Sequence, residues 1–118
     1  MNNADRAREL LIEARRRISE NQNTFICAAI QEAEEERRDE DRVWGYFDAS
    51  YALRSWIADM LLPYSTYGHW VRYEHKQLRL GLLVFELNEK EREGRLAWID
   101  WMLEQDLSKI VKKYKPIV

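Results

Sequence analysis

Few residues in this sequence could carry chemistry. The candidate metal ligands and nucleophiles are two histidines, His69 and His75, and a single cysteine, Cys27. Zinc ligands on one face of a helix are three or four residues apart, whereas these histidines are six apart. Cys27 is followed by acidic residues rather than by the basic groups that activate a thiol. We therefore expect no metal site, and we assign Cys27 to packing.

Among the carboxylates, Asp100 is the best candidate for a general base, because it lies in LAWIDWML at the edge of a predicted buried stripe. The alternative, which we favour, is an ion pair with an arginine such as Arg95 or Arg54. Gly81 and Gly94 are isolated, so neither begins a glycine-rich phosphate-binding loop. The sequence therefore predicts neither an enzyme nor a protein with a cofactor.

Two features are candidates for partner binding, and the first is an acidic run over 32–41. It could mimic a row of phosphates and occupy a basic groove on a partner, or it could simply be a solvated helix end. The run contains seven acidic residues, which are Glu32, Glu34, Glu35, Glu36, Asp39, Glu40 and Asp41.

The second candidate is an apolar face formed by Trp98, Trp101 and Met102, nearly opposite the main stripe of the last predicted helix. Either this helix runs through the middle of a bundle and buries both faces, or the second face is exposed for a partner. Exposed tryptophan is a typical hot-spot residue in protein interfaces. We expect the core interpretation for Trp98 and leave both open for Trp101.

The basic residues give a weaker indication of nucleic-acid binding. Arginines of the N-terminal helix flank both sides of its apolar stripe, whereas a recognition helix gathers them on one face. The C-terminal lysines are a better cluster, although cations near a helix C-terminus are favoured for dipole reasons alone. A nucleic-acid-binding module is therefore an alternative function. The lysines concerned are Lys109, Lys112, Lys113 and Lys115.

Apolar residues at helical spacing predict the elements that would position these groups. A helix over 4–18 has Asn3 as its N-cap, and a helix over 25–38 is capped by Thr24. The apolar spacing of the second helix ends at Ala33.

The middle of the chain predicts two further helices. One is capped by Asp48 or Ser50 and runs to about 62, where Pro63 stops it. A shorter one begins after Ser65 or Thr66 and runs to about 76.

The segment 78–87 is too uniformly apolar to separate helix from strand, and we favour helix. Asn88 is a good N-cap for a final helix over 89–114, which would be about 39 Å long at 1.5 Å per residue. The stripes of these helices predict one core that contains Leu10, Leu11, Ile18, Phe25, Ile57, Leu96, Ile99, Leu103 and Leu107.

Composition favours one folded domain over 1–118. The chain is 46% hydrophobic, and its 34% charged residues nearly cancel to a net charge of -2. Four glycines and two prolines are too few for the turns of a sandwich or barrel. Apolar runs such as 82–85 are far too short to cross a membrane. We expect an all-α protein, a compact bundle of about five helices with a long C-terminal helix, in the cytoplasm.

Three stretches together resemble small helical proteins encoded by tailed bacteriophages and prophages. They are NTFICAAI at 23–30, LRSWIADMLLPYSTYGHWV at 53–71 and GRLAWIDWMLEQ at 94–105. The shared pattern is an aromatic-Ile-Cys motif, then Leu-Arg-x-Trp-Ile, a capped segment with Trp, and finally Arg-Leu-x-Trp-Ile-Asp. The residues that match are Phe25, Ile26 and Cys27, Leu53 to Ile57, Thr66 with Trp70, and Arg95 to Asp100.

This resemblance implies a phage accessory protein in the bacterial host cytoplasm that binds a host protein. An inhibitor of a bacterial defence system, of the anti-CRISPR type, is the narrower form of that expectation. A purely structural phage protein is a further alternative, and a homo-oligomer is compatible with each of them. The resemblance carries over no catalytic residue.

Overall fold

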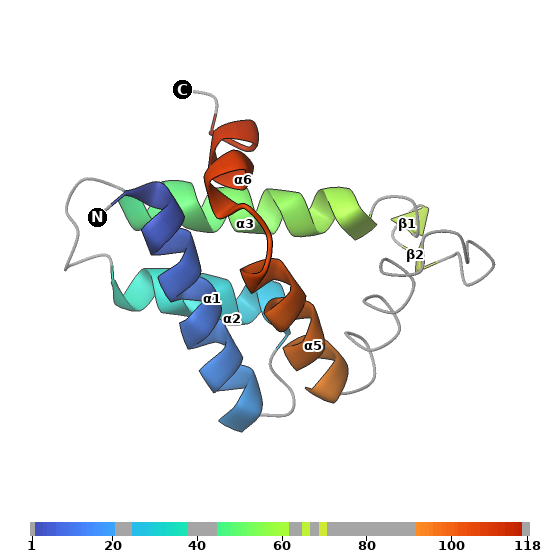
Figure 1. The fold of residues 1–118 in the computed structure, drawn as a ribbon. Coiled ribbons are helices and arrows are strands. Elements are labelled where there is room, and N and C mark those ends of the chain that lie inside the picture. The colour runs from blue at the N-terminus through green and yellow to red at the C-terminus, as the bar shows by residue number, and fades with distance from the viewer. Residues whose placement is uncertain are drawn as a thin grey trace.

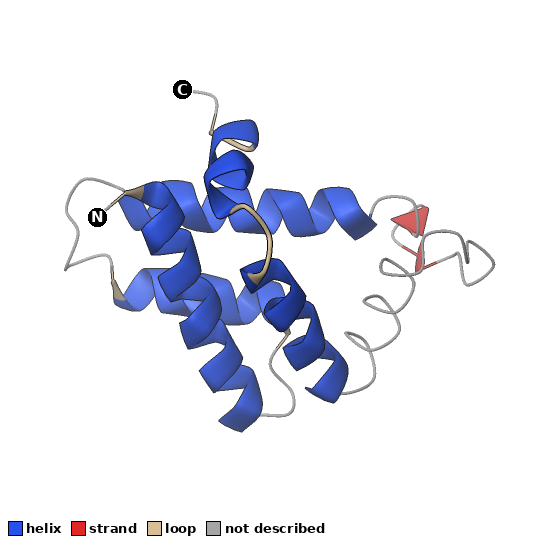
Figure 2. Ribbon diagram, in the orientation of Figure 1, coloured by secondary structure: helices blue, strands red, loops and turns tan. Residues whose placement is uncertain are grey.

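The computed structural model describes residues 2–20, 25–37, 45–61, 65–66, 69–70 and 92–116. Within these residues the chain is a compact all-α globule of five helices with one short pair of strands (Figures 1 and 2). The elements are α1 (Asn3–Glu20), α2 (Ile26–Glu36), α3 (Gly45–Leu61), β1 (Ser65–Thr66), β2 (His69–Trp70), α5 (Arg92–Leu103) and α6 (Leu107–Lys113).

Helix α1 is the centre of the fold, because it packs against α2, α3, α5 and α6 (Figure 1). Its buried stripe confirms the helical spacing predicted from the sequence, and consists of Ala7, Leu10, Leu11, Ala14 and Ile18. The other described helices contribute to the same hydrophobic core, including Ile30 of α2 and Leu53 of α3. Among the described residues, no helix is long and apolar enough to span a membrane.

Most of the predicted core is confirmed. The side chains of Leu10, Leu11, Ile18, Ile57, Ile99 and Leu107 are buried. Leu96 and Leu103 are only partly buried, because the face of α5 that points inward is centred on Trp98, Ile99 and Met102.

The prediction for Phe25 is wrong, because its side chain is 44% exposed. Phe25 is the N-cap residue of α2 and not a residue of its buried stripe. Its ring packs instead against the guanidinium of Arg95, whose carbon lies 5.4 Å from the ring centroid.

The long C-terminal helix is also wrong, since the last helix is the short α6. The chain leaves the α-helix after Leu103, where the amides of Glu104 and Gln105 donate to carbonyls three residues back. Asp106 then starts a new helix as its N-cap, and its carboxylate accepts from the amide of Lys109 at 3.4 Å. The break separates α5 from α6.

The predicted N-caps of the first three helices also need correction. Asn2, and not Asn3, caps α1, because its Oδ1 accepts from the amide of Asp5 at 2.8 Å. The N-cap position of α2 is one residue later than predicted, at Phe25, and makes no side-chain capping bond. Helix α3 begins at Gly45, so Asp48 lies in its first turn and Ser50 is buried within it.

The shorter helix predicted after Ser65 is wrong where the structure describes the chain. Ser65 and Thr66 pair antiparallel with Trp70 and His69. Residues 71–76, the ambiguous segment 78–87, and Asn88 lie outside the described residues.

Candidate functional site

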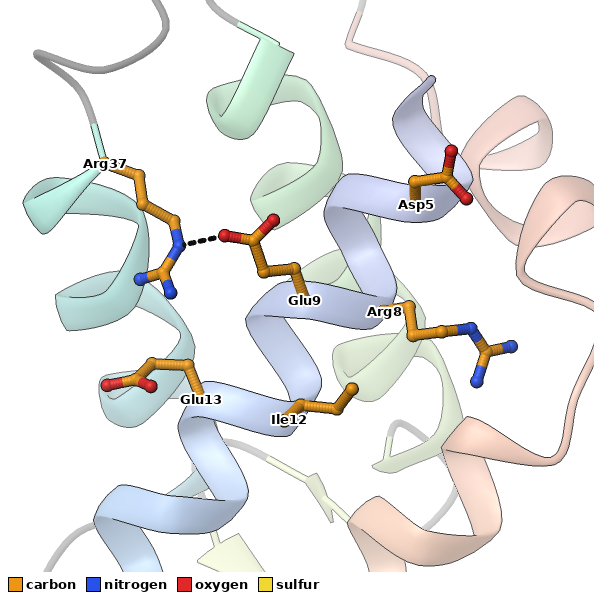
Figure 3. A pocket seen from close by; sticks show the side chains of 6 residues that line it. All are labelled: Asp5, Arg8, Glu9, Ile12, Glu13 and Arg37. Atoms are coloured by element: carbon orange, nitrogen blue, oxygen red, sulfur yellow. Dashed lines mark hydrogen bonds and ion pairs between the residues drawn. The ribbon is translucent and has the colours of Figure 1, made fainter. Parts of the chain in front are cut away.

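The outer face of α1 carries an open pocket of about 320 Å³ (Figure 3). It is lined by Asp5, Arg8, Glu9, Ile12, Glu13 and Arg37. Five of these six residues are charged, and the sixth, Ile12, is 55% exposed. The arrangement is an apolar side chain on α1 surrounded by acidic and basic side chains.

Glu9 is held in place by two other helices. Its carboxylate accepts from Arg37 Nε, at the end of α2, at 2.6 Å, and from the hydroxyl of Tyr46, in α3, at 2.9 Å (Figure 3 shows the first). Both side chains of this ion pair are at least partly shielded from water. This wall of the pocket therefore has a fixed position relative to the fold.

The two remaining walls are also tied to their neighbours. Arg8 points toward the C-terminal helices in Figure 3, and its Nη1 donates to the carbonyl oxygen of Leu103 at 3.3 Å. Glu13 pairs with Arg16, one turn along α1, and with Arg17 at 3.3 Å. The hydrogen bond from Arg16 lowers the pKa of Glu13, so its carboxylate is ionised at neutral pH.

An ionic network connects this pocket to the acidic face of α2. Arg17 pairs with Glu36 and lies 3.8 Å from a carboxylate oxygen of Glu32. Its hydrogen bond to Glu36 lowers the pKa of that carboxyl group. Glu32 and Glu36, two of the predicted acidic residues, are therefore exposed to solvent but also lie close to α1, because the Arg17 side chain extends toward them from α1.

The other predicted acidic residues have different surroundings. Glu34 is buried and Glu35 is exposed. Asp39, Glu40 and Asp41 lie outside the described residues. The described part of the run therefore does not form a single acidic face, because Glu34 is buried while Glu32, Glu35 and Glu36 are exposed.

The tryptophan face predicted on α5 does not join this site. Trp98 and Met102 are buried, which supports the central-helix interpretation for both. Trp101 is partly buried, and its ring packs at 5.6 Å from that of Trp56 in a tilted arrangement. Of these three side chains, a partner approaching the described helices would reach Trp101 alone.

Asp100 forms an ion pair, as expected, but its partner is Arg15. The two groups make a bidentate contact between α5 and α1, with Nε–Oδ1 and Nη2–Oδ2 distances of 2.6 and 3.2 Å. Both side chains are about half exposed, at 43% and 50%. The hydrogen bond to Asp100 raises the pKa of the Arg15 guanidinium.

Cys27 is not one of the residues that line the pocket. The Cys27 side chain is partly buried, and burial raises the pKa of its thiol while Arg54 opposes the shift. His69 belongs to β2, and His75 lies outside the described residues. In the part of the chain that the structure describes, no group of three or more His, Cys, Asp or Glu side chains could hold a metal ion.

Ile12 is not among the site residues predicted from the sequence, although the sequence contains an indication of it. At about 100° per residue, Ile12 lies roughly 130° from the middle of the apolar stripe of α1. It is therefore an aliphatic residue on a face that is otherwise charged.

Comparison of the chain with protein-family models, curated proteins and solved structures finds no match.

Proposed function

We propose that this protein works by binding another protein through the outer face of α1, with Ile12 as the apolar anchor. The observation that carries the proposal is the position of Ile12, half exposed in a pocket whose other lining residues are all charged. Protein interfaces commonly have an apolar centre and a polar rim, and this pocket has both on a small scale. Glu9 and Arg8 in its walls are fixed by hydrogen bonds to residues outside α1, so little ordering of these side chains is needed on binding.

The composition of the pocket favours a protein over a small molecule. Small-molecule sites are mostly apolar and enclose most of their ligand, with a few polar groups for orientation. In this pocket one lining residue is apolar and five are charged, and the pocket is open to solvent. A partner that inserts one apolar side chain and places charges of both signs around it would match this surface.

The nature of the partner is a further part of the proposal. The resemblance of three sequence stretches to proteins of tailed phages and prophages supports a host protein as the partner. An inhibitor of a bacterial defence system, of the anti-CRISPR type, is the narrower version. In both versions the protein acts by occupying a surface and carries out no reaction itself.

The test compares two lysine substitutions in affinity capture from a bacterial lysate. Ile12→Lys places a charge at the anchor, whereas Ala97→Lys places the same charge on an exposed position of α5. The captured host protein should be lost, by about tenfold or more, with Ile12→Lys and retained with Ala97→Lys. Thermal melts must show that both variants fold as the unmodified protein does. Equal capture by the two variants would show that the α1 face is not the binding surface.

A further inference from the structure

Arginine and lysine are used differently in this protein. The ion pairs seen among the described residues include those of Arg15, Arg16, Arg17 and Arg37. Lysine makes none of them. The positive charge of these arginines is therefore balanced within the fold, whereas the charge of the described lysines is not.

The unbalanced positive charge is concentrated at α6. Four of the six lysines of the chain lie between positions 109 and 115. Lys109, Lys112 and Lys113 are three and four residues apart, so they share one face of the helix. All four are exposed, and we call them the lysine face: Lys109, Lys112, Lys113 and Lys115.

The acidic groups near α6 do not neutralise this face. Asp106 is at the N-terminal end of the helix, where its carboxylate accepts from the backbone amide of Lys109 and forms no ion pair with a lysine of this face. Glu104 precedes it in the connection from α5. Asp59, on α3, accepts a hydrogen bond from the hydroxyl of Tyr114. Lys113 lies over the ring of that tyrosine, with Nζ 5.3 Å from the centroid.

We propose that the lysine face binds the phosphate backbone of nucleic acid without reading its sequence. Protein interfaces are depleted in lysine and are built around apolar anchors, whereas nucleic-acid interfaces are polar and strongly positive. Among the described residues, the large exposed apolar side chains are Ile12, Phe25 and Tyr51, and none of them is on α6. The face also lacks the arginine, asparagine and glutamine side chains that pair with base edges.

The net charge of -2 gives no indication of this positive surface, because it is a sum that includes the acidic residues of other helices as well as the lysine face. Binding by such a small surface should be weak and strongly dependent on salt. Each lysine–phosphate contact contributes about 0.9 to the slope of log affinity against log salt on duplex DNA. Four contacts give a slope of about 3.6, so affinity should fall roughly a hundredfold between about 50 mM and about 200 mM salt.

The experiment measures binding of the full chain to a short fluorescent duplex of random sequence by anisotropy, across that salt range. The double variant Lys112→Gln, Lys113→Gln should reduce the slope by about 1.8. The matched control is Arg15→Gln, Arg16→Gln, which removes the same charge from arginines that are already paired. The control should keep the slope of the unmodified protein. Melts of all three proteins would confirm that each is folded.

Three results of the duplex experiment would overturn the proposal. They are an absence of duplex binding at the lowest salt, a slope unchanged by the lysine substitutions, or an equal reduction in the arginine control. Binding to polyglutamate in place of the duplex would also overturn it, because the occupant would then be an acidic protein segment.

Discussion

Helices α5 and α6 come from one stretch of sequence with the apolar spacing of a single helix, yet the fold uses them in opposite ways. Helix α5 buries Trp98, Ile99 and Met102, and its Arg92 also donates to the carbonyl oxygen of Ser19 at 3.1 Å. In α6 the one fully buried side chain is Leu107, and the opposite face is lysine. The first helix is part of the core, and the second is an exposed element attached to it.

The break between them has a geometric reason. In a continuous helix at about 100° per residue, Leu107 would lie about 180° from Trp98, and Lys109 only about 20° from it. A straight helix that buried Trp98 would therefore point Lys109 toward the core and Leu107 away from it. The interruption at 104–106 allows the chain to turn, so that Trp98 and Leu107 are both buried and Lys109 is exposed.

Replacing Trp98 tests the core side of this comparison and should have the largest effect. Trp98→Ala removes a large side chain that is 1% exposed, and should reduce the free energy of unfolding by roughly 3–5 kcal/mol. For a domain of this length the melting temperature should fall by more than about ten degrees. A melt like that of the unmodified protein would mean that α5 is not a core helix.

A second substitution shows whether the indole ring or its polar N–H matters. The buried Nε1 of Trp98 has no hydrogen-bond partner among the described residues. Trp98→Phe keeps an aromatic ring and removes this donor, so its cost should be clearly smaller than that of Trp98→Ala. Equal losses would indicate a hidden partner for the N–H group.

The same comparison shows what the sequence could and could not predict. The stripe of α1 follows from helical spacing alone, because Leu10, Leu11 and Ile18 have no alternative face. The spacing from 89 to 114 is ambiguous, because it contains two apolar stripes, and a straight helix that buried Trp98 would also point Lys109 toward the core. Recognising Asp106 as an N-cap would have resolved it, because Asp favours that position over a helix interior. Arg15–Asp100 joins residues 85 positions apart, which helical periodicity cannot pair.

Removing the cap tests the break itself. Asp106→Ala takes away the carboxylate that accepts from the amide of Lys109, and should cost about 1 kcal/mol of unfolding free energy. Asp106→Asn should retain most of the stability, because asparagine is an equally good N-cap. Hydrogen exchange at the Lys109 amide should be faster in the alanine variant only. Unchanged stability and exchange in Asp106→Ala would mean that other contacts fix the start of α6.

The smallest change in the free energy of unfolding is expected for a substitution of Tyr114, at the end of α6, and this change should depend on pH. The hydroxyl of Tyr114 donates to Asp59 Oδ2 at 2.6 Å. Burial and this hydrogen bond raise the pKa of Tyr114 from 10.0 to about 12. Because the exposed bond contributes modestly, Tyr114→Phe should cost about 1 kcal/mol or less at neutral pH.

The pH dependence follows from the sign of that shift. The folded pKa lies above the unfolded value, so the contribution of Tyr114 is complete below pH 10 and is lost as the pH rises through 12. The difference in unfolding free energy between the unmodified protein and Tyr114→Phe should therefore shrink over this range. Lysine titration cancels in the difference, because both proteins have the same lysines. In an Asp59→Ala background, Tyr114→Phe should cost less than in the unmodified protein. An equal cost in both backgrounds would show that this hydrogen bond does not hold α6 against α3.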